Sequence, residues 1–557
     1  MQIENNRPLY AVISDVDFHT NPDTYESVLE KARLHPVDVF SDTAFRNDRV
    51  LCKLDVFSTD IPLHDVQAAI GDFKTENGDV ISSGCADIRF ITPTFAHDAG
   101  IWIPDCIDTK DPIDMDRKTV RTLFLRIDIP ETAAAGAYTA ELTLSCREAV
   151  SLVFRLHVSV LPYTLPQRPD TPFRLELWMY PYSAERYYAD IDTKQYFGED
   201  VTRLPFIHLT GKADAALRSQ LKLYASAGGK AITVTCVEDP WNTQTYDPYP
   251  SMIKWHHHED DSFSFDYTDF DKWVRLNMEC GVSAAIKTFS IAAWGNRVTY
   301  INDDNSVSTE APAPGSERWT KLWSAFLRDY MRHTEEMGWF DKTYISMDER
   351  EPEEIEAVLS LNDSIKNADG KSFRTALAVY RFDAAHLFDR IDDLSLALGM
   401  DEPLVKDIAQ KRRLAGKTTT LYTCGPSCSA LANEPYESEY SQLYTAKQQT
   451  DGFLRWALDS FNADPIASSA HRLFAAGDLY MIYPDHIGKG FEAHSSHRFE
   501  KIAAGIRDVL KIRVLADAKP ECRERLADPL DSLGKESTDL HAEVRRVMNG
   551  VYRIAEE

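Results

Sequence analysis

The sequence predicts an α/β protein in which an amino-terminal antiparallel β-sandwich precedes a (β/α)8 TIM barrel. Three observations support this prediction. Residues 51–161 alternate between apolar and polar side chains, a proline-rich stretch follows, and after it short apolar runs alternate with longer helical stretches. The predicted divisions are a sandwich over 1–165, a barrel over 173–515 and a charged helical tail over 516–557.

The sandwich is predicted from alternation with period two. "TLFLRIDIP" and "VSLVFRLHVSVL" each place their apolar residues on one face, and "AGAYTAELTLSC" between them provides a small-residue turn and another strand. Short strands joined by turns are typical of a sandwich. The module is predicted to end at "LPYTLPQRPDTP", whose prolines favour extended chain. The two faces consist of Leu123, Leu125, Ile127 and Ile129, and of Val150, Leu152, Phe154, Leu156, Val158 and Val160.

The barrel is predicted from short apolar runs that are separated by helical stretches. One such stretch, "ERWTKLWSAFLRDYMRHTEEMGWF", places large apolar residues on a single stripe, which we interpret as packing. The predicted strands are "FRLELWM" from Phe173, "AITVTC" from Ala231, "SAAIKTF" from Ser283, "TYISM" from Thr343, "FRTALAV" from Phe373, "LSLALG" from Leu394, "TTTLYTC" from Thr418 and "GFLRWAL" from Gly452.

The charge of the chain argues against two classes of partner. Of its 557 residues, 61 are Lys or Arg and 88 are Asp or Glu, so the formal net charge is -27. Such a charge repels phosphate backbones and anionic lipid surfaces, and no segment has the roughly 18 consecutive apolar residues of a membrane span. We therefore expect neither nucleic acid nor membrane as a partner.

Cysteine usage and the amino terminus predict a cytoplasmic protein. The chain has nine cysteines, an odd and scattered set that fits reduced thiols better than a disulfide framework. "MQIENNRPLYAVISDVD" lacks the basic and apolar regions of a secretory signal. Since the close pair Cys424 and Cys428 in "CGPSC" has no second Cys or His pair at comparable spacing, we predict no metal, and we also predict no cofactor.

Two adjacent acids, Asp348 and Glu349 in "YISMDEREPEE", follow the fourth predicted strand. Neighbouring carboxylates repel each other, and burial makes that repulsion costlier, so the pair suggests function. In a (β/α)8 barrel the carboxyl ends of the strands form the active-site face, and both acids belong there. The alternative is that they start a helix, where acids cap free N–H groups.

Aromatic residues lie at or just after other predicted strand ends. Sugar rings stack their C–H faces on aromatic rings, so aromatics that converge on one rim with two acids favour a carbohydrate site. Each ring taken alone is more often part of a core. These residues are Trp178, Tyr180, Trp241, Trp294, Tyr380, Tyr422 and Trp456.

Several stretches, in order along the chain, resemble glycoside hydrolase family 123, the β-N-acetylgalactosaminidases, and their relatives. The resemblance covers about residues 173–515, and a β-sandwich before the barrel also matches the family layout. The stretches are "LKLYASAGGKAITVTCVEDPWNTQTYDPYPSMIKW", "FSFDYTDFDKWV", "YISMDEREPEE", "LYTCGP", "GFLRWAL" and "AAGDLYMIYP".

The resemblance implies a retaining, substrate-assisted mechanism without a protein nucleophile. Glu349 is then the general acid and base, and Asp348 holds the N–H of the 2-acetamido group, whose carbonyl oxygen attacks the anomeric carbon. By the same resemblance Tyr422 contacts the acetamide and Trp241, Trp294 and Trp456 wall the sugar. The remaining predicted substrate-binding residues are Trp178, Tyr380, Asn433, Asp478 and Tyr483.

Adjacency of the two acids suits this division of roles. A protein nucleophile and an acid on opposite sides of one anomeric centre need a separation of about 5 Å across the sugar, which sequence neighbours do not readily achieve. The positive intermediate favours an ionised Asp348, whose charge and apolar surroundings would keep Glu349 protonated.

The predicted partner is a small glycan or glycoconjugate that ends in β-linked N-acetylgalactosamine. Two alternatives stay open: another 2-acetamido sugar such as β-N-acetylglucosamine on the same barrel, and a non-catalytic carbohydrate-binding protein. The stretch "MIYPDHIGKGFEAHSSHRFEKIAAGIRDVLKI" departs from the family pattern, and we expect it to reshape one loop at the rim.

Overall fold

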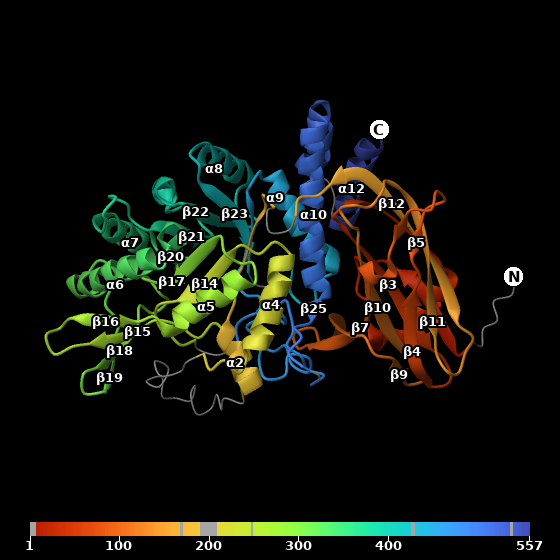
Figure 1. The fold of residues 1–557 in the computed structure, drawn as a ribbon, viewed down its shortest axis with the longest axis horizontal. Coiled ribbons are helices and arrows are strands. Elements are labelled where there is room, and N and C mark those ends of the chain that lie inside the picture. The colour runs from red at the N-terminus through yellow and green to blue at the C-terminus, as the bar shows by residue number, and fades with distance from the viewer. Residues whose placement is uncertain are drawn as a thin grey trace.

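A mainly antiparallel β-sandwich and a parallel (β/α)8 barrel lie on opposite sides of the long helix α10 in the computed structural model (Figure 1). The structure describes residues 7–167, 171–189, 209–246, 249–424, 429–488, 490–534 and 539–557.

Two sheets form the amino-terminal sandwich, and their facing sides make a separate apolar core. The first sheet has the order β1 (Leu9–Ser14), β3 (Arg49–Ser58), β10 (Thr119–Asp128), β7 (Ala86–Ala96), β8 (Ile101–Thr109) and β25 (Ser495–Ser496). The second has the order β2 (Val39–Arg46), β12 (Leu152–Thr164), β11 (Gly136–Ser145), β4 (Leu63–Ile70) and β9 (Ile113–Met115), with β5 (Phe73–Lys74) and β6 (Val80–Ile81) at its side. Helix α1 (Tyr25–Leu34) packs on strands β3 and β10.

The sequence pattern locates this core well, with two differences. Leu123, Leu125 and Ile127 are buried, as period two predicts. The prediction that Val150 belongs to the buried face is wrong, because this residue precedes β12 and is 89% exposed. The sandwich also has one parallel pair, β2 with β12, since the chain returns to β2 only after a long excursion.

All eight predicted barrel strands are confirmed. They form one parallel sheet, and a bridge between Leu175 and Gly229 brings its first two strands together. In chain order the strands are β13 (Arg174–Leu177), β14 (Ala231–Thr235), β17 (Ala285–Phe289), β20 (Thr343–Asp348), β21 (Arg374–Val379), β22 (Asp393–Ala397), β23 (Thr418–Thr423) and β24 (Gly452–Arg455).

Helices surround this barrel, and the predicted stripe on α6 is buried throughout. The connection from β21 to β22 is a 3₁₀ helix, Ala385–Arg390, where the ideal barrel has an α-helix. The α-helices are α2 (Pro181–Ala189), α4 (Asp214–Ser226), α5 (Thr268–Glu279), α6 (Glu317–Glu336), α7 (Pro352–Ser364), α8 (Glu402–Leu414), α9 (Pro435–Lys447) and α10 (His497–Ala518). The loops after β14 and β17 add a four-stranded sheet in the order β16 (Phe263–Asp266), β15 (Lys254–His257), β18 (Val298–Asn302) and β19 (Val307–Glu310).

The sandwich and the barrel share strand pairing and buried charges. Strand β25, which leads directly into α10, pairs with β8 of the sandwich. Arg498 on α10 donates to Asp105 on β8 at 2.9 Å, and both side chains are at most 1% exposed. Because breaking a buried ion pair leaves an uncompensated charge, this contact holds the two parts in one register.

Two helices follow α10, α11 (Arg523–Ser532) and α12 (Leu540–Glu556). Their apolar residues, such as Leu526 and Val547, belong to the same buried cluster as the barrel core. Among the described helices, none is both long and apolar enough to cross a membrane.

Candidate active site

Asp348 is the last residue of β20, and Glu349 follows it directly at the carboxyl-end face of the barrel. Both side chains are half-buried. Glu349 has a φ of 48°, in the left-handed region, and its N–H donates to the carbonyl of Ala378 on β21 at 3.0 Å. Successive residues of a strand point to opposite faces, so this backbone turn allows both acids to serve one side. Positive φ at a non-glycine residue costs free energy and is concentrated at functional sites.

The helix-capping alternative is wrong for these two acids. Helix α7 begins at Pro352, and its N-cap is Glu351. Glu351 and Glu354 form a reciprocal capping box with the backbone. The acids at 348 and 349 are therefore not needed to cap the helix.

Different aromatic residues hold the two acids. Nε1 of Trp294, from the loop after β17, donates to Oδ2 of Asp348 at 3.2 Å. The hydroxyl of Tyr422 on β23 donates to Oε1 of Glu349. Tyr422 is thus bonded to Glu349, and burial together with the Glu349 charge raises its pKa, which keeps its proton in place as a donor.

Burial and, to a smaller extent, the neighbouring charge of Glu349 together raise the pKa of Asp348 to about 7. The Trp294 N–H and the Arg350 charge oppose this shift. In the unliganded site this shift favours a proton on Asp348. The sequence argument expected an ionised Asp348 for the positively charged intermediate, which is a different state of the site.

A group of buried aromatic rings in tilted and edge-on contact lies just after β13. Trp178 and Trp241, at most 2% exposed, have ring centroids 5.8 Å apart. Tyr180 lies against Trp241 at 5.1 Å, and the Asp348 charge contributes to the raised pKa of its hydroxyl, although burial is the main cause. Nε1 of Trp241 is buried and has no hydrogen-bond partner among the described residues, so it is a donor available to a ligand.

Trp456 is fixed by a buried polar group. Its Nε1 donates to Oδ2 of Asp478 at 3.1 Å, and Arg455 on β24 forms an ion pair with Oδ1 of the same carboxylate. Asp478 and Arg455 are both fully buried. The hydrogen bond to Asp478 thus fixes the orientation of the Trp456 ring. Trp456 also packs on Phe474, with ring centroids 4.7 Å apart.

Three predicted site residues lie in other surroundings. Asn433 bonds Glu437 through its side chain and His19 of the sandwich through its carbonyl. The hydroxyl of Tyr483 donates to Asp105 of the sandwich at 2.7 Å, so it is also at the interface between sandwich and barrel. Tyr380 follows β21, is 49% exposed and stacks on Arg381. The structure does not bring these three side chains against the acid pair.

Two residues near the acids were not singled out from the sequence. Arg350 lies over the Trp294 ring, 5.2 Å from its centroid, and lowers the pKa of Asp348. Asp459 accepts from the Tyr180 N–H at 2.7 Å, and burial raises its pKa to about 7. Its Oδ2 has no partner within the described ranges. The signal for Asp459 was its place four residues after the last barrel strand.

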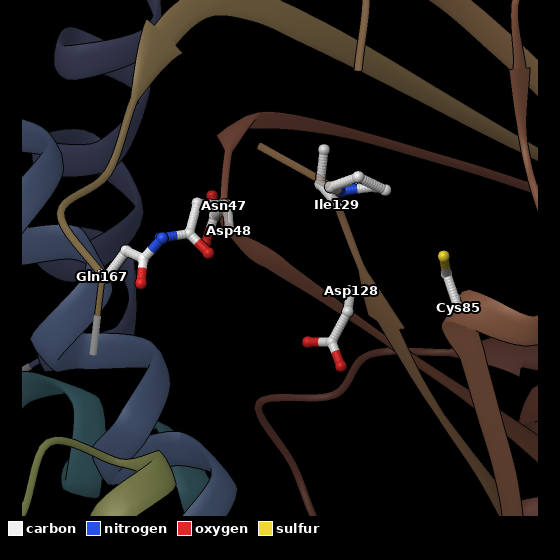
Figure 2. A pocket seen from close by; sticks show the side chains of 7 residues that line it. Asn47, Asp48, Cys85, Asp128, Ile129 and Gln167 are labelled. Carbon is white, nitrogen blue, oxygen red and sulfur yellow. The ribbon is translucent and has the colours of Figure 1, made fainter. Parts of the chain in front are cut away.

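A cavity of about 480 Å³ at the sandwich does not contain two acids that are free for catalysis (Figure 2). It is lined by Asp48 and Asp128, among others. Lys511 contacts Asp48 at 3.0 Å and Arg49 contacts Asp128 at 2.8 Å, so both carboxylates are committed to ion pairs. This cavity therefore does not compete with Asp348 and Glu349 as a candidate catalytic site.

Comparisons with known proteins show which family the chain belongs to. The model of the glycoside hydrolase 123 catalytic domain matches residues 212–515, and that of the glycoside hydrolase 123 N-terminal domain matches residues 24–146. No curated protein matches the chain.

Among solved structures, a family 123 glycoside hydrolase from Clostridium perfringens, studied for glycolipid glycan hydrolysis, is 30% identical. The match covers 98% of each chain with a TM-score of 0.89. A GH5 xyloglucanase from Bacteroides ovatus is 9% identical over 85% of this chain and 98% of that one, and its TM-score of 0.31 is too low to support an argument. Because the catalytic model covers more than half of the chain and the Clostridium enzyme matches almost all of it, the protein belongs to glycoside hydrolase family 123 and is a glycoside hydrolase.

Proposed function

We propose that the protein is a retaining exo-β-N-acetylgalactosaminidase in which the substrate's own acetamide is the nucleophile. The observation that carries the proposal is the separate attachment of two adjacent acids, Asp348 to Trp294 and Glu349 to Tyr422. Sequence neighbours held in this way can serve two atoms of one sugar, the acetamide nitrogen and the glycosidic oxygen.

In the first step Glu349 donates a proton to the glycosidic oxygen as the bond to the anomeric carbon breaks. The acetamide carbonyl oxygen bonds to that carbon from the opposite side and forms an oxazolinium ion. Asp348 accepts a hydrogen bond from the acetamide N–H, which orients the group, and its negative charge stabilises the cation. In the second step Glu349 takes a proton from water, which attacks the anomeric carbon and restores the acetamide with retained configuration.

Substrate binding supplies the ionised Asp348 that this mechanism needs. In the empty site burial raises the pKa of Asp348 to about 7. A hydrogen bond donated by the acetamide stabilises the charged carboxylate and lowers that pKa. A substrate without an acetamide offers neither this donor nor the nucleophile, so the raised pKa itself contributes to selection for 2-acetamido sugars.

The proposed partner is a small glycan or glycoconjugate with a terminal β-linked N-acetylgalactosamine. Support comes from the Clostridium perfringens enzyme, which is described as acting on a glycolipid glycan. The partly exposed ring of Trp294, which is bonded to Asp348, offers apolar surface near the acids for a sugar ring. A β-N-acetylglucosaminidase on the same barrel and a non-catalytic carbohydrate-binding protein are the rivals.

Wild-type enzyme assayed on chromogenic β-N-acetylgalactosaminide, β-N-acetylglucosaminide and β-galactoside separates these possibilities. Turnover of the first alone supports the proposal, and turnover mainly of the second supports the first rival. Glycan binding without turnover supports the second rival. Equal turnover of the β-galactoside would remove acetamide participation, and NMR of the first-formed anomer tests retention.

We also propose a cytoplasmic location. The eight cysteines within the described ranges are all free thiols, as a reducing compartment favours. Fractionation of the source cells, with the protein detected by antibody, tests this location.

A further inference from the structure

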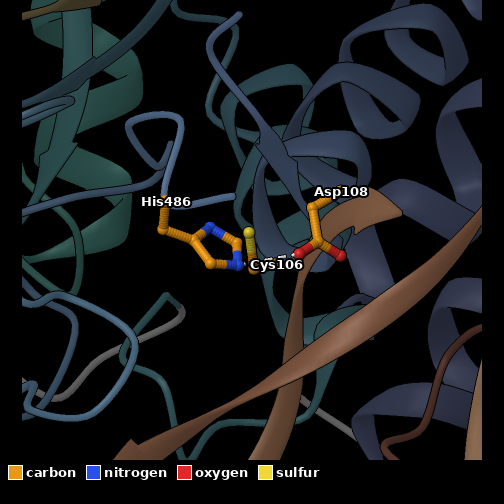
Figure 3. Close-up of side chains that lie close together, drawn as sticks. All are labelled: Cys106, Asp108 and His486. Atoms are coloured by element: carbon orange, nitrogen blue, oxygen red, sulfur yellow. Dashed lines mark ion pairs between the residues drawn. The ribbon is translucent and has the colours of Figure 1, made fainter. Parts of the chain in front are cut away.

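A cluster of metal-ligand side chains lies between the sandwich and the barrel, apart from the acid pair (Figure 3). Cys106 and Asp108 come from β8, and His486 comes from the segment after the last barrel strand. One ligand atom from each of the three lies within 4.8 Å of the other two. The cluster adjoins a cavity of about 460 Å³ lined by Asp108, His486 and His494 among others.

Fold topology brings these residues together. Cys106 and Asp108 are two apart on β8, and the pairing with β7 shifts register at Asp108, which leaves the ligand atoms of both residues close together. His494 precedes β25, which pairs with β8, and a bridge between Tyr483 and His494 closes the loop that carries His486. The loop between Tyr483 and His494, which we expected to lie at the barrel rim, thus contacts the sandwich.

Several polar atoms in the cluster make no hydrogen bond, although Nε2 of His494 lies 3.7 Å from Oδ1 of Asp485. Within the described residues, Oδ1 of Asp108, Nδ1 of His486 and both ring nitrogens of His494 are buried without a hydrogen bond. Asp108 and His494 are each 4% exposed. Buried polar groups in native proteins nearly always have partners, so four such atoms in one place indicate a missing ligand.

The distances fit a small, tetrahedrally coordinated cation. Nε2 of His486 lies 2.9 Å from Oδ2 of Asp108. Two ligands on a tetrahedral zinc ion, each bound at about 2.0 Å, are roughly 3.3 Å apart, so an ion can replace the shared proton with a small adjustment. The His494 ring lies beside this group, with its centroid 5.6 Å from that of His486, and must move closer to the other three residues to supply a fourth ligand.

The surrounding charges permit a cation. Four carboxylates (Asp108, Asp111, Asp485 and Glu492) and three basic side chains (Arg89, Lys110 and Arg121) line the cavity. Arg89 is paired with Glu492 at 2.6 Å and Lys110 with Asp87 at 3.2 Å. A thiolate, a carboxylate and two neutral imidazoles would balance the two charges of the ion.

We propose that Cys106, Asp108, His486 and His494 bind a divalent transition metal ion of the zinc class, which fastens the loop after β24 to strand β8. On binding, the Cys106 thiol and the shared His486–Asp108 site release their protons, and the metal takes their place. With four protein ligands the site is closed, so its role is structural. The proposal does not depend on the proposed galactosaminidase activity.

A second cluster, Asp15, Asp17 and His541, carries no such proposal. Asp17 already contacts Lys501 at 2.6 Å and Arg545 at 3.0 Å. Two protein cations therefore fill the place that a metal would take.

Cobalt titration of the tag-free, full-length protein after removal of metals tests the site. Tetrahedral cobalt bound to a thiolate gives intense visible bands and a near-ultraviolet charge-transfer band. We expect saturation at one equivalent, displacement by zinc, and loss of the near-ultraviolet band in Cys106→Ser. The control Cys85→Ser, in the same sandwich, should keep the full spectrum.

A second variant covers the case in which Cys106→Ser fails to fold. The His486 side chain is 20% exposed, so His486→Gln should fold, as circular dichroism checks, and should bind zinc at least tenfold more weakly by calorimetry. Zinc should raise the unfolding temperature of wild type, and a chelator should reverse the rise. Absence of stoichiometric binding, or equal binding by wild type and His486→Gln, would overturn the proposal and leave a protonated His486–Asp108 pair.

Discussion

Nε1 of Trp294 donates a hydrogen bond of 3.2 Å to Oδ2 of Asp348 across the barrel mouth. This donor is the largest stabilising influence on the ionised form of a carboxyl whose pKa burial raises to about 7. We therefore expect Trp294 to favour ionisation of Asp348.

Trp294→Phe should shift the pH dependence of the reaction. The variant keeps an aromatic ring but loses the N–H, so the pKa of Asp348 rises further. If ionised Asp348 is required, the acidic limb of the kcat/KM profile moves to higher pH by about one unit. Trp102→Phe, on the sandwich and 38% exposed, is the control. An unmoved acidic limb would show that Trp294 does not tune this group.

Asp348→Asn should reduce kcat by about 10² to 10⁴ with a much smaller change in KM, because the lost charge acts mainly on the oxazolinium-like transition state. Steady-state kinetics on a β-N-acetylgalactosaminide measure both constants. Asp341→Asn, with a side chain 78% exposed, should behave as wild type. A near-normal kcat for Asp348→Asn contradicts the role of the residue.

The same variant should be more stable than wild type in alkaline solution. Because the folded-state pKa of Asp348 is about 7 against an ordinary 3.8, the native protein binds more protons than the unfolded chain between these values. Wild-type stability therefore falls as pH rises through this window, and Asp348→Asn lacks that contribution. The free energy of unfolding of the variant relative to wild type should increase by about 2 kcal/mol from pH 4 to pH 8, after allowing for solvent screening. Urea unfolding at both pH values measures it, and parallel pH dependences would refute the assigned shift.

Glu349→Gln should show a rate loss that depends on the leaving group. An alkyl or sugar leaving group needs the proton from Glu349, whereas a dinitrophenolate does not, so bond cleavage in the latter is nearly retained. Pre-steady-state bursts with activated substrates would then reveal slow hydrolysis of the intermediate. Equal losses for both kinds of substrate would mean that Glu349 is not the general acid.

The fold could be predicted from local sequence, while the details of the site could not. Each barrel strand is a short apolar run between polar segments, and all eight were located for that reason. The left-handed backbone of Glu349 depends on pairing with Ala378 on the next strand, which no local pattern encodes. Proton placement on Asp348 likewise depends on burial by segments distant in sequence.

Asn433 and Tyr483 show a second limit. Both lie in stretches that resemble the family, and motif order does not say whether a side chain points to the pocket or to a neighbouring domain. The β-sandwich partners that receive them, His19 and Asp105, lie outside the stretches on which the resemblance in the sequence was based.

Tyr483→Phe tests whether Tyr483 belongs to the substrate site or to the interface. Its hydroxyl donates to Asp105 at 2.7 Å and accepts from Thr94 at 3.0 Å, and all three side chains are buried. Removing this hydroxyl leaves the Thr94 donor and one side of Asp105 unsatisfied, so the free energy of unfolding should fall by about 1–3 kcal/mol. Tyr380→Phe, at an exposed tyrosine, should change stability little. KM for the β-N-acetylgalactosaminide should stay within about twofold of wild type in Tyr483→Phe, since 0.4 kcal/mol corresponds to about that factor. A large rise in KM without loss of stability would place Tyr483 in the substrate site after all.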